Sequence, residues 1–447
     1  MAVSFSFEKL KEMGVTADIA KKLTLRSKNL MPQFKKNHFS SNEQVVTVKM
    51  FFVKNKKIYL PFTFSKNYFK TTFNQKENYP QIFDSRDGKF RGSLLERQIE
   101  PFNEAREYLK KEKTVTIALY PGFGKTFLGC MLSWYLNLYT CVLIHQESIA
   151  KQWVKTFQKY FDLPPEEIVL VTGKTDFSKA KVIVAMDGRV EKIPDSVKEK
   201  IGLLIIDEAH CFCTPSRVVP MLSFTPKYVI AETATPEKDN GLHTVIQSIA
   251  GEHFIRKLST KPYKFYIVHT NLDFAISSSG NIFGELLTNQ ASSKERNKIV
   301  VDILKKNQKF KTIIVTSRKQ HCEILHDLIS EEGMESSELY GNKKNYVPKN
   351  ILIGTGSKMG VGFDEANFCD NYDGTPSELL LITYTFASWA PFEQVRGRGM
   401  RSENPKVVMF MDNNSITVKH FRKIKKWVKE SNGEIINVKK LDDLTIG

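Results

Sequence analysis

Cysteine is scarce in this chain of 447 residues, and of the six present only Cys211 and Cys213 lie close together. The six form no Cys-x-x-Cys pair and show no spacing typical of a zinc site. The sequence therefore indicates neither a disulfide-stabilised domain nor a zinc centre. The cysteines fit the reduced, partly buried thiols of an intracellular protein.

Long apolar runs are also absent, since none approaches the roughly 18 residues that a membrane-spanning helix needs. The N-terminus lacks the pattern of a signal peptide, and no low-complexity tract or short-period repeat occurs. We therefore expect a soluble, intracellular protein that is not secreted and does not enter a membrane.

Acidic residues are outnumbered, because 49 Asp and Glu stand against 66 Lys and Arg, which gives a formal charge of +17 and a pI near 9.3. This excess favours a polyanionic partner such as nucleic acid, since each neutralised phosphate releases counterions. A solvated lysine-rich surface explains the charge equally well. The length allows two or three domains.

Residues 1–90 are interpreted as a small accessory domain that contains β-structure. A short helix is expected over residues 17–25, and segments 45–53 and 58–64, rich in β-branched and aromatic residues, flank a lysine-rich turn and predict a hairpin. The lysines and aromatic side chains could bind and stack on nucleic acid, although aromatic residues in a hairpin more often belong to a core. These aromatic residues are Phe51, Phe52, Tyr59, Phe62 and Phe64.

From Leu94 onward, short apolar strands alternate with helices, which is typical of a parallel sheet covered on both faces. A first series of strands is expected at residues 115–119, 141–144, 168–172, 181–185, 203–206 and 228–231. After a bridging region near residues 250–290, a second series is expected at residues 312–315, 350–354, 379–383 and 407–411. Helices are expected over residues 127–138 and 420–430, so the sequence predicts an α/β fold with two similar lobes.

Residues 119–126 read Leu-Tyr-Pro-Gly-Phe-Gly-Lys-Thr and lie between an apolar strand and an apolar helix, which is the context of a phosphate-binding turn. The backbone of Gly122, Phe123 and Gly124 and the positive end of the helix dipole would face the phosphates. The strict pattern has a glycine where Leu119 stands. Taken alone, the motif could therefore be an ordinary strand-to-helix turn with a surface lysine.

A second motif, Asp-Glu-Ala-His, ends a buried apolar strand about 80 residues after Gly-Lys-Thr. Open α/β sheets bind ligands at the carboxyl ends of their strands. Lys125 would reach the β- and γ-phosphates of ATP, while Thr126 and Asp207 would hold Mg²⁺. Glu208 would orient or deprotonate the attacking water, and His210 would link the nucleotide site to the rest of the machinery. An acidic pair can also end a strand as a solvated turn, but this spacing is hard to obtain by chance.

These motifs resemble those of superfamily 2 helicases and translocases, and the resemblance extends over about residues 90–430. It implies two tandem RecA-like lobes with parallel sheets: an ATP-binding lobe over residues 91–255 and a helicase C-terminal lobe over residues 256–447. Gln98 resembles the glutamine that contacts adenine. Thr233 and Thr235 belong to a Thr-Ala-Thr-Pro motif that couples hydrolysis to lobe movement.

In the second lobe, the resemblance places Gly362 and Asp364 of Gly-Val-Gly-Phe-Asp at the nucleotide. Gln394 begins a close match to Gln-x-x-Gly-Arg-x-x-Arg, which is a catalytic motif of the superfamily. Arg398 and Arg401, on one face if helical, would be arginine fingers that stabilise the transferring phosphoryl group when the lobes close. A lone Arg-Gly-Arg could instead be a flexible loop that binds RNA loosely.

The same resemblance suggests contacts with the nucleic-acid backbone, which position the substrate but carry no sequence information. Each of these residues could equally be an ordinary cap or turn residue. The candidates are Gln152, Thr172, Gly173, Ser317, Arg318 and Thr355.

Several departures narrow the resemblance within the superfamily. Pro121 replaces the usual threonine of the phosphate-binding turn, and no aromatic residue accompanies Gln98, so adenine selectivity is open. Long insertions and an accessory C-terminal domain are absent, which argues against the large DEAH RNA-processing helicases. The compact layout resembles the XPB-related group, which includes transcript-release helicases of large cytoplasmic DNA viruses and branch-migration helicases of phages. The 31 phenylalanines and many lysines fit an AT-rich viral genome.

We therefore expect an ATPase that uses ATP and Mg²⁺ to move on DNA or RNA–DNA duplexes, with DNA favoured over RNA, in viral transcript release. RNA polymerase or other transcription factors would be partners, and a monomer in the host cytoplasm or the virion is expected. A repair or recombination helicase that anneals or branch-migrates strands, or the motor subunit of a restriction or remodelling complex, are alternatives. A non-catalytic nucleic-acid-binding subunit is a further one, against which the intact motif residues argue.

Overall fold

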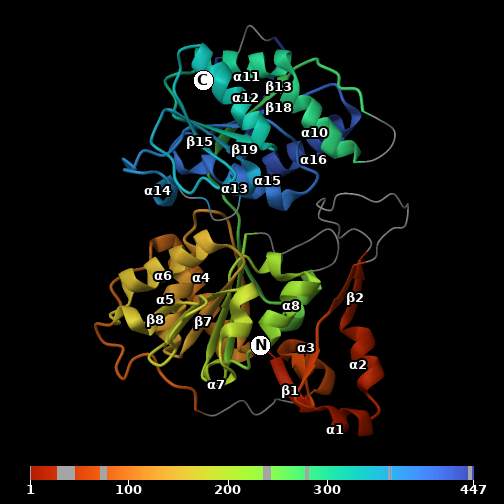
Figure 1. Ribbon diagram of the computed structural model, residues 1–447, viewed down its shortest axis with the longest axis vertical. Coiled ribbons are helices and arrows are strands. Elements are labelled where there is room, and N and C mark those ends of the chain that lie inside the picture. The colour runs from red at the N-terminus through yellow and green to blue at the C-terminus, as the bar shows by residue number, and fades with distance from the viewer. Residues whose placement is uncertain are drawn as a thin grey trace. The chain divides into compact units, whose positions relative to one another are not determined.

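The computed structural model describes residues 2–27, 46–70, 78–234, 243–276, 281–360, 363, 365–440 and 445–446. Two compact units make up the chain (Figure 1). Unit 1 comprises Met1–Leu119 and Phe123–Lys257, and unit 2 comprises Tyr120–Gly122 and Leu258–Gly447.

The sheet of unit 1 has seven parallel strands in the order β12-β6-β11-β10-β7-β9-β8. The strands are β6 (Thr114–Leu119), β7 (Thr140–Ile144), β8 (Ile168–Leu170), β9 (Val182–Met186), β10 (Leu203–Ile206), β11 (Tyr228–Thr233) and β12 (Phe254–Lys257). Every residue of β6, β7 and β10 is buried, as expected for central strands that are covered on both faces. The six strands expected in this lobe are confirmed, and β12 is an additional edge strand.

Helices cover both faces of this sheet, with α4, α5 and α6 on one side and α8 on the other (Figure 1). The helices are α4 (Glu96–Glu112), α5 (Lys125–Leu136), α6 (Glu147–Tyr160), α7 (Asp195–Lys198), α8 (Pro215–Leu222) and α9 (His243–Ala250). Short 3₁₀ turns are η1 (Pro165–Glu167), η2 (Asp187–Lys192) and η3 (Ala209–Phe212).

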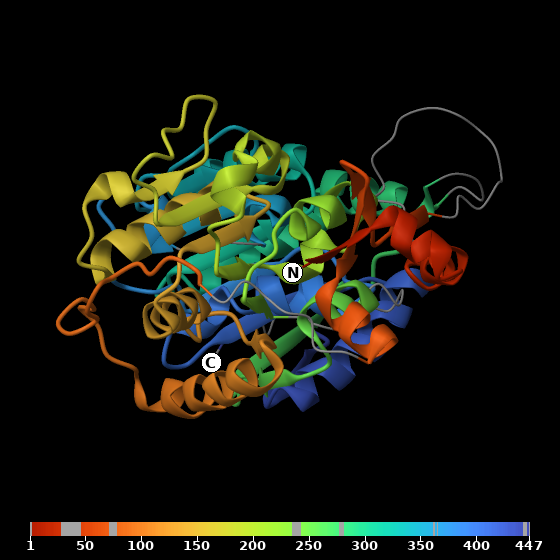
Figure 2. The same ribbon diagram turned by 90° about the horizontal axis from the view of Figure 1, so that it is seen from below.

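The N-terminal part of unit 1 forms small antiparallel sheets with three short helices, seen in red and orange in Figure 2. Its elements are β1 (Ala2–Ser6), α1 (Phe7–Glu12), α2 (Thr16–Lys22), β2 (Thr24–Ser27), β3 (Val46–Lys49), β4 (Phe52–Lys54), β5 (Lys57–Pro61) and α3 (Phe62–Phe69). The expected hairpin is present as β4 and β5, which Asn55 and Lys56 join with positive φ angles of 51° and 57°. Such angles suit a two-residue hairpin turn. The single strand expected over residues 45–53 is instead divided, because β3 pairs with β2 in a separate sheet.

Two further expectations for this segment are wrong in detail. The strand expected up to Phe64 ends at Pro61, because Pro61 is the N-cap of α3 and the chain continues as a helix. The helix expected up to Leu25 ends at Lys22, since Thr24 begins a strand paired with β3.

The aromatic residues of the hairpin region lie in or against a core that this segment shares with the main sheet. Phe62 is only 7% exposed, and Phe51, Phe52, Tyr59 and Phe64 are partly buried against the same cluster. The structure therefore favours the core alternative over stacking on nucleic acid. The domain boundary at residue 90 stays a prediction.

Unit 2 contains a second sheet of seven parallel strands in the order β15-β16-β14-β17-β18-β13-β19. The strands are β13 (Tyr263–His269), β14 (Thr312–Thr316), β15 (Ser336–Leu339), β16 (Ile351–Thr355), β17 (Leu379–Ile382), β18 (Lys406–Met411) and β19 (Gly433–Val438). The four expected strands are confirmed and occupy the centre of the sheet, while β13, β15 and β19 are additional. The predicted α/β fold with two RecA-like lobes is thus confirmed.

Helices again cover both faces of the second sheet, and each face packs its own apolar cluster. They are α10 (Ile282–Ser292), α11 (Lys294–Lys306), α12 (Lys319–Glu331), α13 (Gly356–Met359), α14 (Glu365–Phe368), α15 (Trp389–Arg396) and α16 (Ser415–Glu430), with the 3₁₀ turn η4 (Gly399–Arg401).

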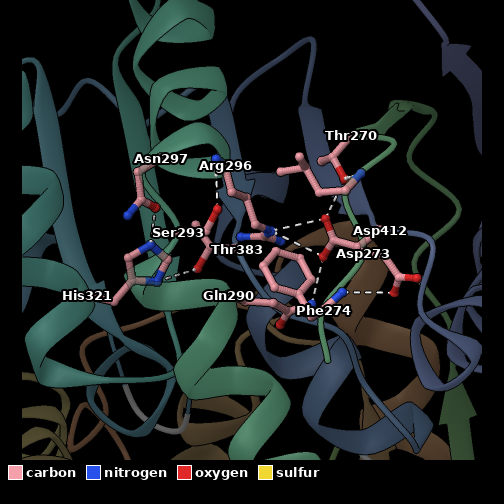
Figure 3. A network of polar contacts seen from close by, with 11 residues as sticks. Thr270, Asp273, Phe274, Gln290, Ser293, Arg296, Asn297, His321, Thr383 and Asp412 are labelled. Carbon is pink, nitrogen blue, oxygen red and sulfur yellow. Dashed lines mark hydrogen bonds and ion pairs between the residues drawn. The ribbon is translucent and has the colours of Figure 1, made fainter. Parts of the chain in front are cut away.

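A buried polar network joins α10 and α11 to the carboxyl ends of two strands of unit 2 (Figure 3). Asp412, directly after β18, and Arg296 are both fully buried, and Arg296 Nε lies 3.2 Å from each Asp412 carboxylate oxygen. Gln290 donates from Nε2 to Asp412 Oδ2 (2.7 Å), and Thr270 donates from Oγ1 to Oδ1 (2.5 Å). The Arg296 guanidinium also lies over the ring of Phe410, 5.1 Å from its centroid. The network therefore fixes this helical hairpin to the sheet.

Candidate functional site

The Gly-rich turn follows β6 and leads into α5, as its predicted context requires. Gly122 and Gly124 have φ angles of +84° and +100°, in the left-handed region that glycine tolerates best. Lys125 is the first residue of α5, and its Nζ donates to the carbonyl of Leu119 at 3.1 Å. Thr126 follows in the first turn of the same helix. The backbone amides of this first helical turn point out of the N-terminal end of α5.

Gln98 lies directly against this turn. Its side chain is only 2% exposed, and Nε2 donates to the carbonyl of Phe123 at 3.1 Å while Oε1 accepts from the amide of Leu95 at 3.0 Å. A Cβ atom at Gly124 would collide with Nε2, so the glycine is needed for this close approach. Gln98 thus braces the turn and caps α4, and its predicted contact with adenine stays a prediction.

Asp207 and Glu208 directly follow the carboxyl end of β10, on the same edge of the sheet as the Gly-rich turn. Asp207 is 5% exposed; its Oδ2 accepts from Trp153 Nε1 at 2.8 Å and its Oδ1 accepts from the amide of Glu208 at 2.8 Å. Burial, reinforced by the Glu208 carboxylate, raises the pKa of Asp207 to about 6, although the Trp153 hydrogen bond and the nearby Lys125 ammonium act in the opposite direction. The lysine and the carboxylate predicted to bind the nucleotide and its metal therefore share one electrostatic site.

The predicted coupling residues meet one another. His210 Nδ1 lies 3.0 Å from Thr233 Oγ1 and 3.4 Å from a carboxylate oxygen of Glu208. Glu208 itself has a φ angle of +49°, which is uncommon for a residue other than glycine and marks local backbone strain. One histidine thus contacts both the acidic motif and the end of β11, while Thr235 lies outside the described residues.

Sequence reasoning missed Glu232, which precedes Thr233 on β11. Its side chain is fully buried, and neither carboxylate oxygen has a hydrogen-bond partner among the described residues. A Cβ atom at Gly129 of α5 would lie 2.5 Å from Glu232 Oε1 and 2.8 Å from a ring carbon of Trp153. Burial, followed by the charge of Asp207, raises the pKa of Glu232 well above its usual range. No motif position indicated this third carboxyl group; only a charged residue inside an apolar strand could have drawn attention to it.

In unit 2, the predicted arginine fingers follow α15 rather than sharing one helix. The helix ends at Arg396, and Arg401 belongs to the separate turn η4, so the condition that both arginines lie on one helical face is not met. Arg398 donates to the carbonyls of Met359 (3.0 Å) and Phe363 (2.6 Å) and also to that of Gly360. Its guanidinium thus bonds to described residues just before and within the Gly-Val-Gly-Phe-Asp motif. The buried Gln394 lies on α15 itself, and Gly362 and Asp364 are outside the described residues.

The predicted nucleic-acid contacts lie on helix α6 and at or after the carboxyl ends of β8, β14 and β16. In unit 1, Gln152 lies on α6, and the exposed Thr172 and Gly173 follow β8, where the Thr172 amide donates to Thr175 Oγ1 at 2.7 Å. This bond is typical of a turn, as the alternative interpretation expected.

In unit 2, Arg318 lies two residues after β14, and Thr355 is the last residue of the neighbouring strand β16, so the structure brings them to the same end of the sheet. Arg318 donates from Nη2 to the carbonyl of Gly284 at 3.1 Å, and Thr355 lies 3.0 Å from Ser357, oxygen to oxygen. Ser317 lies immediately before Arg318, between β14 and α12. The roles of these residues stay predictions.

Two findings on the described ranges bear on what the site can bind. The described residues contain no group of three or more His, Cys, Asp or Glu side chains that could hold a metal ion. No helix in the same part of the chain has the length and apolar character to cross a bilayer.

Comparison with known proteins gives consistent results. Residues 91–238 match the family model described as "Type III restriction enzyme, res subunit". The chain is 28% identical over 419 residues to "Putative helicase 161L" of Invertebrate iridescent virus 6, which covers 86% of this chain and 90% of the relative. It is 24% identical over 356 residues to "Transcript termination protein A18" of Yaba-like disease virus, covering 71% of each protein. It is also 27% identical over 167 residues to "DNA 3'-5' translocase XPB2" of Sulfurisphaera tokodaii, covering 37% of each.

Among solved structures, the fold resembles that of S. cerevisiae Dbp5 bound to RNA and ADP BeF3, with a TM-score of 0.56 at 15% identity over 76% of this chain and 90% of that one. The two parallel sheets, the ordered motifs and the relatives together define a nucleic-acid-dependent ATPase of the helicase type that uses a nucleotide and binds nucleic acid. The chain is similar to helicases and translocases of superfamily 2. Within it, the chain resembles the XPB-related transcript-release helicases of large cytoplasmic DNA viruses.

Proposed function

We propose that this protein couples ATP hydrolysis to movement on DNA or on RNA–DNA duplexes. The observation that carries the proposal is the convergence of Lys125, Asp207 and Glu208 at the carboxyl edge of the first sheet, beside the His210–Thr233 contact. A nucleotide bound to the Gly-rich turn would thus lie within reach of a catalytic carboxylate and of a residue pair that senses its state.

The residues fit Mg²⁺–ATP. Mg²⁺ is usually held by one or two protein oxygens together with substrate phosphates and water, so the absence of a three-residue cluster in the described ranges is no obstacle. The buried Asp207 carboxylate and the Thr126 hydroxyl would hold the ion, which when bound neutralises charge on the phosphates. The ammonium group of Lys125 would stabilise the same phosphates, and Glu208 would orient and deprotonate the attacking water.

Arg398 and Arg401 are proposed to stabilise the charge that develops on the transferring phosphoryl group. The hydrogen bonds from Arg398 to the carbonyls of Met359, Gly360 and Phe363 support a linked role, because a shift of these residues would also move the guanidinium. Gln394 is proposed as a further catalytic residue, and Gln98 as the selector of adenine.

DNA is the favoured substrate over RNA. Among the relatives, the archaeal one is named a DNA translocase and the poxviral one a transcript termination protein, and both names suit the release of transcripts from a DNA template. We propose this role in viral transcription, with RNA polymerase or another transcription factor as a partner and the host cytoplasm or virion as its place. A repair helicase that anneals or branch-migrates strands is the second candidate, because the family model that matches residues 91–238 takes its name from a DNA restriction enzyme.

Two substitutions test the site. Lys125→Ala and Glu208→Gln are each expected to lower ATP turnover by a factor on the order of 10²–10³ or more, since each removes charge stabilisation or water activation from the reaction. Binding of DNA, measured without ATP by fluorescence anisotropy, is expected to stay close to wild type. Turnover at the wild-type level in either variant would refute the assignment of the ATP site.

Substrate class is tested by steady-state ATPase assays without nucleic acid and with single-stranded DNA, duplex DNA, RNA or an RNA–DNA hybrid. Stimulation by DNA well above that by RNA is expected. Preferential stimulation by RNA would move the assignment to RNA remodelling. Equal turnover under all conditions would mean that nucleic acid is not the trigger.

A further inference from the structure

Helix α16 of unit 2, which is labelled in Figure 1, concentrates positive charge more strongly than the chain as a whole. Its 16 residues include six Lys or Arg and one Glu, so they hold a net +5 of the chain's +17. Five of the cations recur at helical spacings of three and four residues and are exposed. We call them the basic stripe: Lys419, Arg422, Lys423, Lys426 and Lys429.

The opposite face of α16 is fixed in the core. Phe421, Ile424 and Val428 are at most 1% exposed and belong to the apolar cluster beneath the sheet, and Thr417 is fully buried on the same side. The helix can therefore not rotate about its axis, and the basic stripe is held toward solvent. Such an amphipathic arrangement orients the charges without help from a ligand.

Few carboxylates neutralise the basic stripe. Lys426 lies 3.7 Å from Glu430, and Lys423 donates to the carbonyl of Ala387 at 3.1 Å. No carboxylate in the described ranges lies within ion-pair distance of Lys419, Arg422 or Lys429.

Helix α11 of the same unit is different, because its lysines alternate with Glu295 and Asp302, and Lys305 lies 2.7 Å from Glu332. An uncompensated row of cations raises the local potential and attracts a polyanion.

We propose that the basic stripe is a second binding surface for duplex DNA, separate from the motif residues, that contacts the phosphate backbone. The stripe extends about 15 Å from Lys419 to Lys429 at 1.5 Å per residue. One strand of B-DNA presents a phosphate about every 3.4 Å along the axis, so about four phosphates face this length. The surface reads no sequence and does not require the nucleotide, and it would keep DNA bound while the motor contacts change. The inference rests on the proposed function only in taking DNA as the substrate.

The test compares two triple variants of the full chain. The stripe variant is Lys419→Gln, Arg422→Gln and Lys429→Gln, which keeps good helix formers and leaves the two hydrogen-bonded or paired lysines in place. The matched control is Lys294→Gln, Lys298→Gln and Lys305→Gln on α11, which removes the same net charge. Binding of a fluorescent DNA duplex is measured without ATP at several salt concentrations, and circular dichroism checks that both variants fold.

For the stripe variant, the slope of log K against log salt is expected to become less negative by roughly 2 to 3, because each lost phosphate contact contributes about 0.9. The DNA concentration that half-activates the ATPase is expected to rise on the order of tenfold, with maximal turnover unchanged. The α11 control is expected to change neither quantity by more than about twofold.

A wild-type slope in the stripe variant would overturn the proposal. An equal change of slope in both variants would also overturn it, because net charge alone would then be responsible. If the stripe variant kept the wild-type slope for DNA but bound an acidic protein more weakly, the proposal would be overturned and the stripe would be assigned to a protein partner. The salt dependence of DNA binding is measured without ATP, so this readout tests the basic stripe even if the proposed ATPase activity fails.

Discussion

At the scale of single residues, the site of unit 1 contains several carboxyl groups that are little exposed to solvent. Asp207 and Glu232 are both buried, and burial is the main cause that raises the pKa of each. The Glu208 carboxylate adds to the rise at Asp207, the Asp207 and Glu208 carboxylates add to it at Glu232, and the Lys125 ammonium acts against both. Asp207 is compensated by two hydrogen bonds, whereas neither carboxylate oxygen of Glu232 has a hydrogen-bond partner among the described residues. A buried polar group without a partner costs about 1–3 kcal/mol of folding free energy.

Replacing Glu232 by the similarly long Met is therefore expected to stabilise the protein. Because the folded-state pKa lies above the ordinary 4.5, the folded chain holds a proton that the unfolded chain releases above that pH. The stability of the wild type is therefore expected to fall as pH rises from about 4.5, by at most about 1.4 kcal/mol per pH unit from this group. Urea unfolding between pH 5 and 8 measures both effects.

The control for this experiment is Glu232→Gln, which keeps the shape and a buried amide but cannot ionise. In this variant, the free energy of unfolding should lose the pH dependence that Glu232 contributes, and it should rise little at pH 5. A pH slope in Glu232→Met as steep as that of the wild type would show that Asp207 or another group is responsible.

Arg398→Lys separates positioning from charge. The lysine keeps the positive charge but cannot make the set of hydrogen bonds that the guanidinium makes with the carbonyls of Met359, Gly360 and Phe363. ATP binding, measured with a fluorescent analogue, is expected to stay nearly unchanged, while turnover falls on the order of 10³-fold. Arg422→Lys is the matched control on an exposed helix. A loss of ATP affinity in step with the loss of turnover would contradict the arginine-finger role.

At the scale of elements, the strands that were predictable differ physically from those that were missed. Strands such as β10 and β17 are buried at every position and appear in the sequence as continuous apolar runs. The edge strand β15 alternates half-exposed with buried residues, and β19 is half-exposed or exposed at every position except its last. The two strands contain Ser, Glu and Asn, so their pattern resembles that of a loop. The candidate site was likewise predictable only in part. Its motif residues are recognisable in the sequence, whereas the place of Glu232 depends on packing against Gly129, which no local pattern encodes.

The α10–α11 hairpin depends on the Arg296–Asp412 pair, and Asp412→Asn is expected to destabilise unit 2 by about 3–5 kcal/mol because it leaves the guanidinium charge buried and unpaired. The double variant Arg296→Met, Asp412→Leu removes both charges and is expected to recover most of that loss. Chemical denaturation of the three proteins measures the difference. If the double variant were less stable than Asp412→Asn, the ion pair itself would be the source of stability.

At the scale of the whole molecule, the chain is two compact units with separate sheets and separate apolar cores. Unfolding of such a chain is not expected to be a single two-state transition. The two stability variants thus report on different parts: Glu232→Met should move a transition of unit 1, and Asp412→Asn one of unit 2. Differential scanning calorimetry resolves this, and a shift of the same transition by both variants would show that the units unfold together.

The hydrogen bond between the Trp153 indole and Asp207 also gives the protein an optical property. Trp153 is one of only four tryptophans, is fully buried, and bonds directly to the carboxylate proposed to hold the metal. Any change of charge on that carboxylate acts on the excited state of the indole. The emission of this tryptophan therefore carries a label-free signal of what occupies the site, and Trp153→Phe would remove that signal while the other three tryptophans remain as an internal reference.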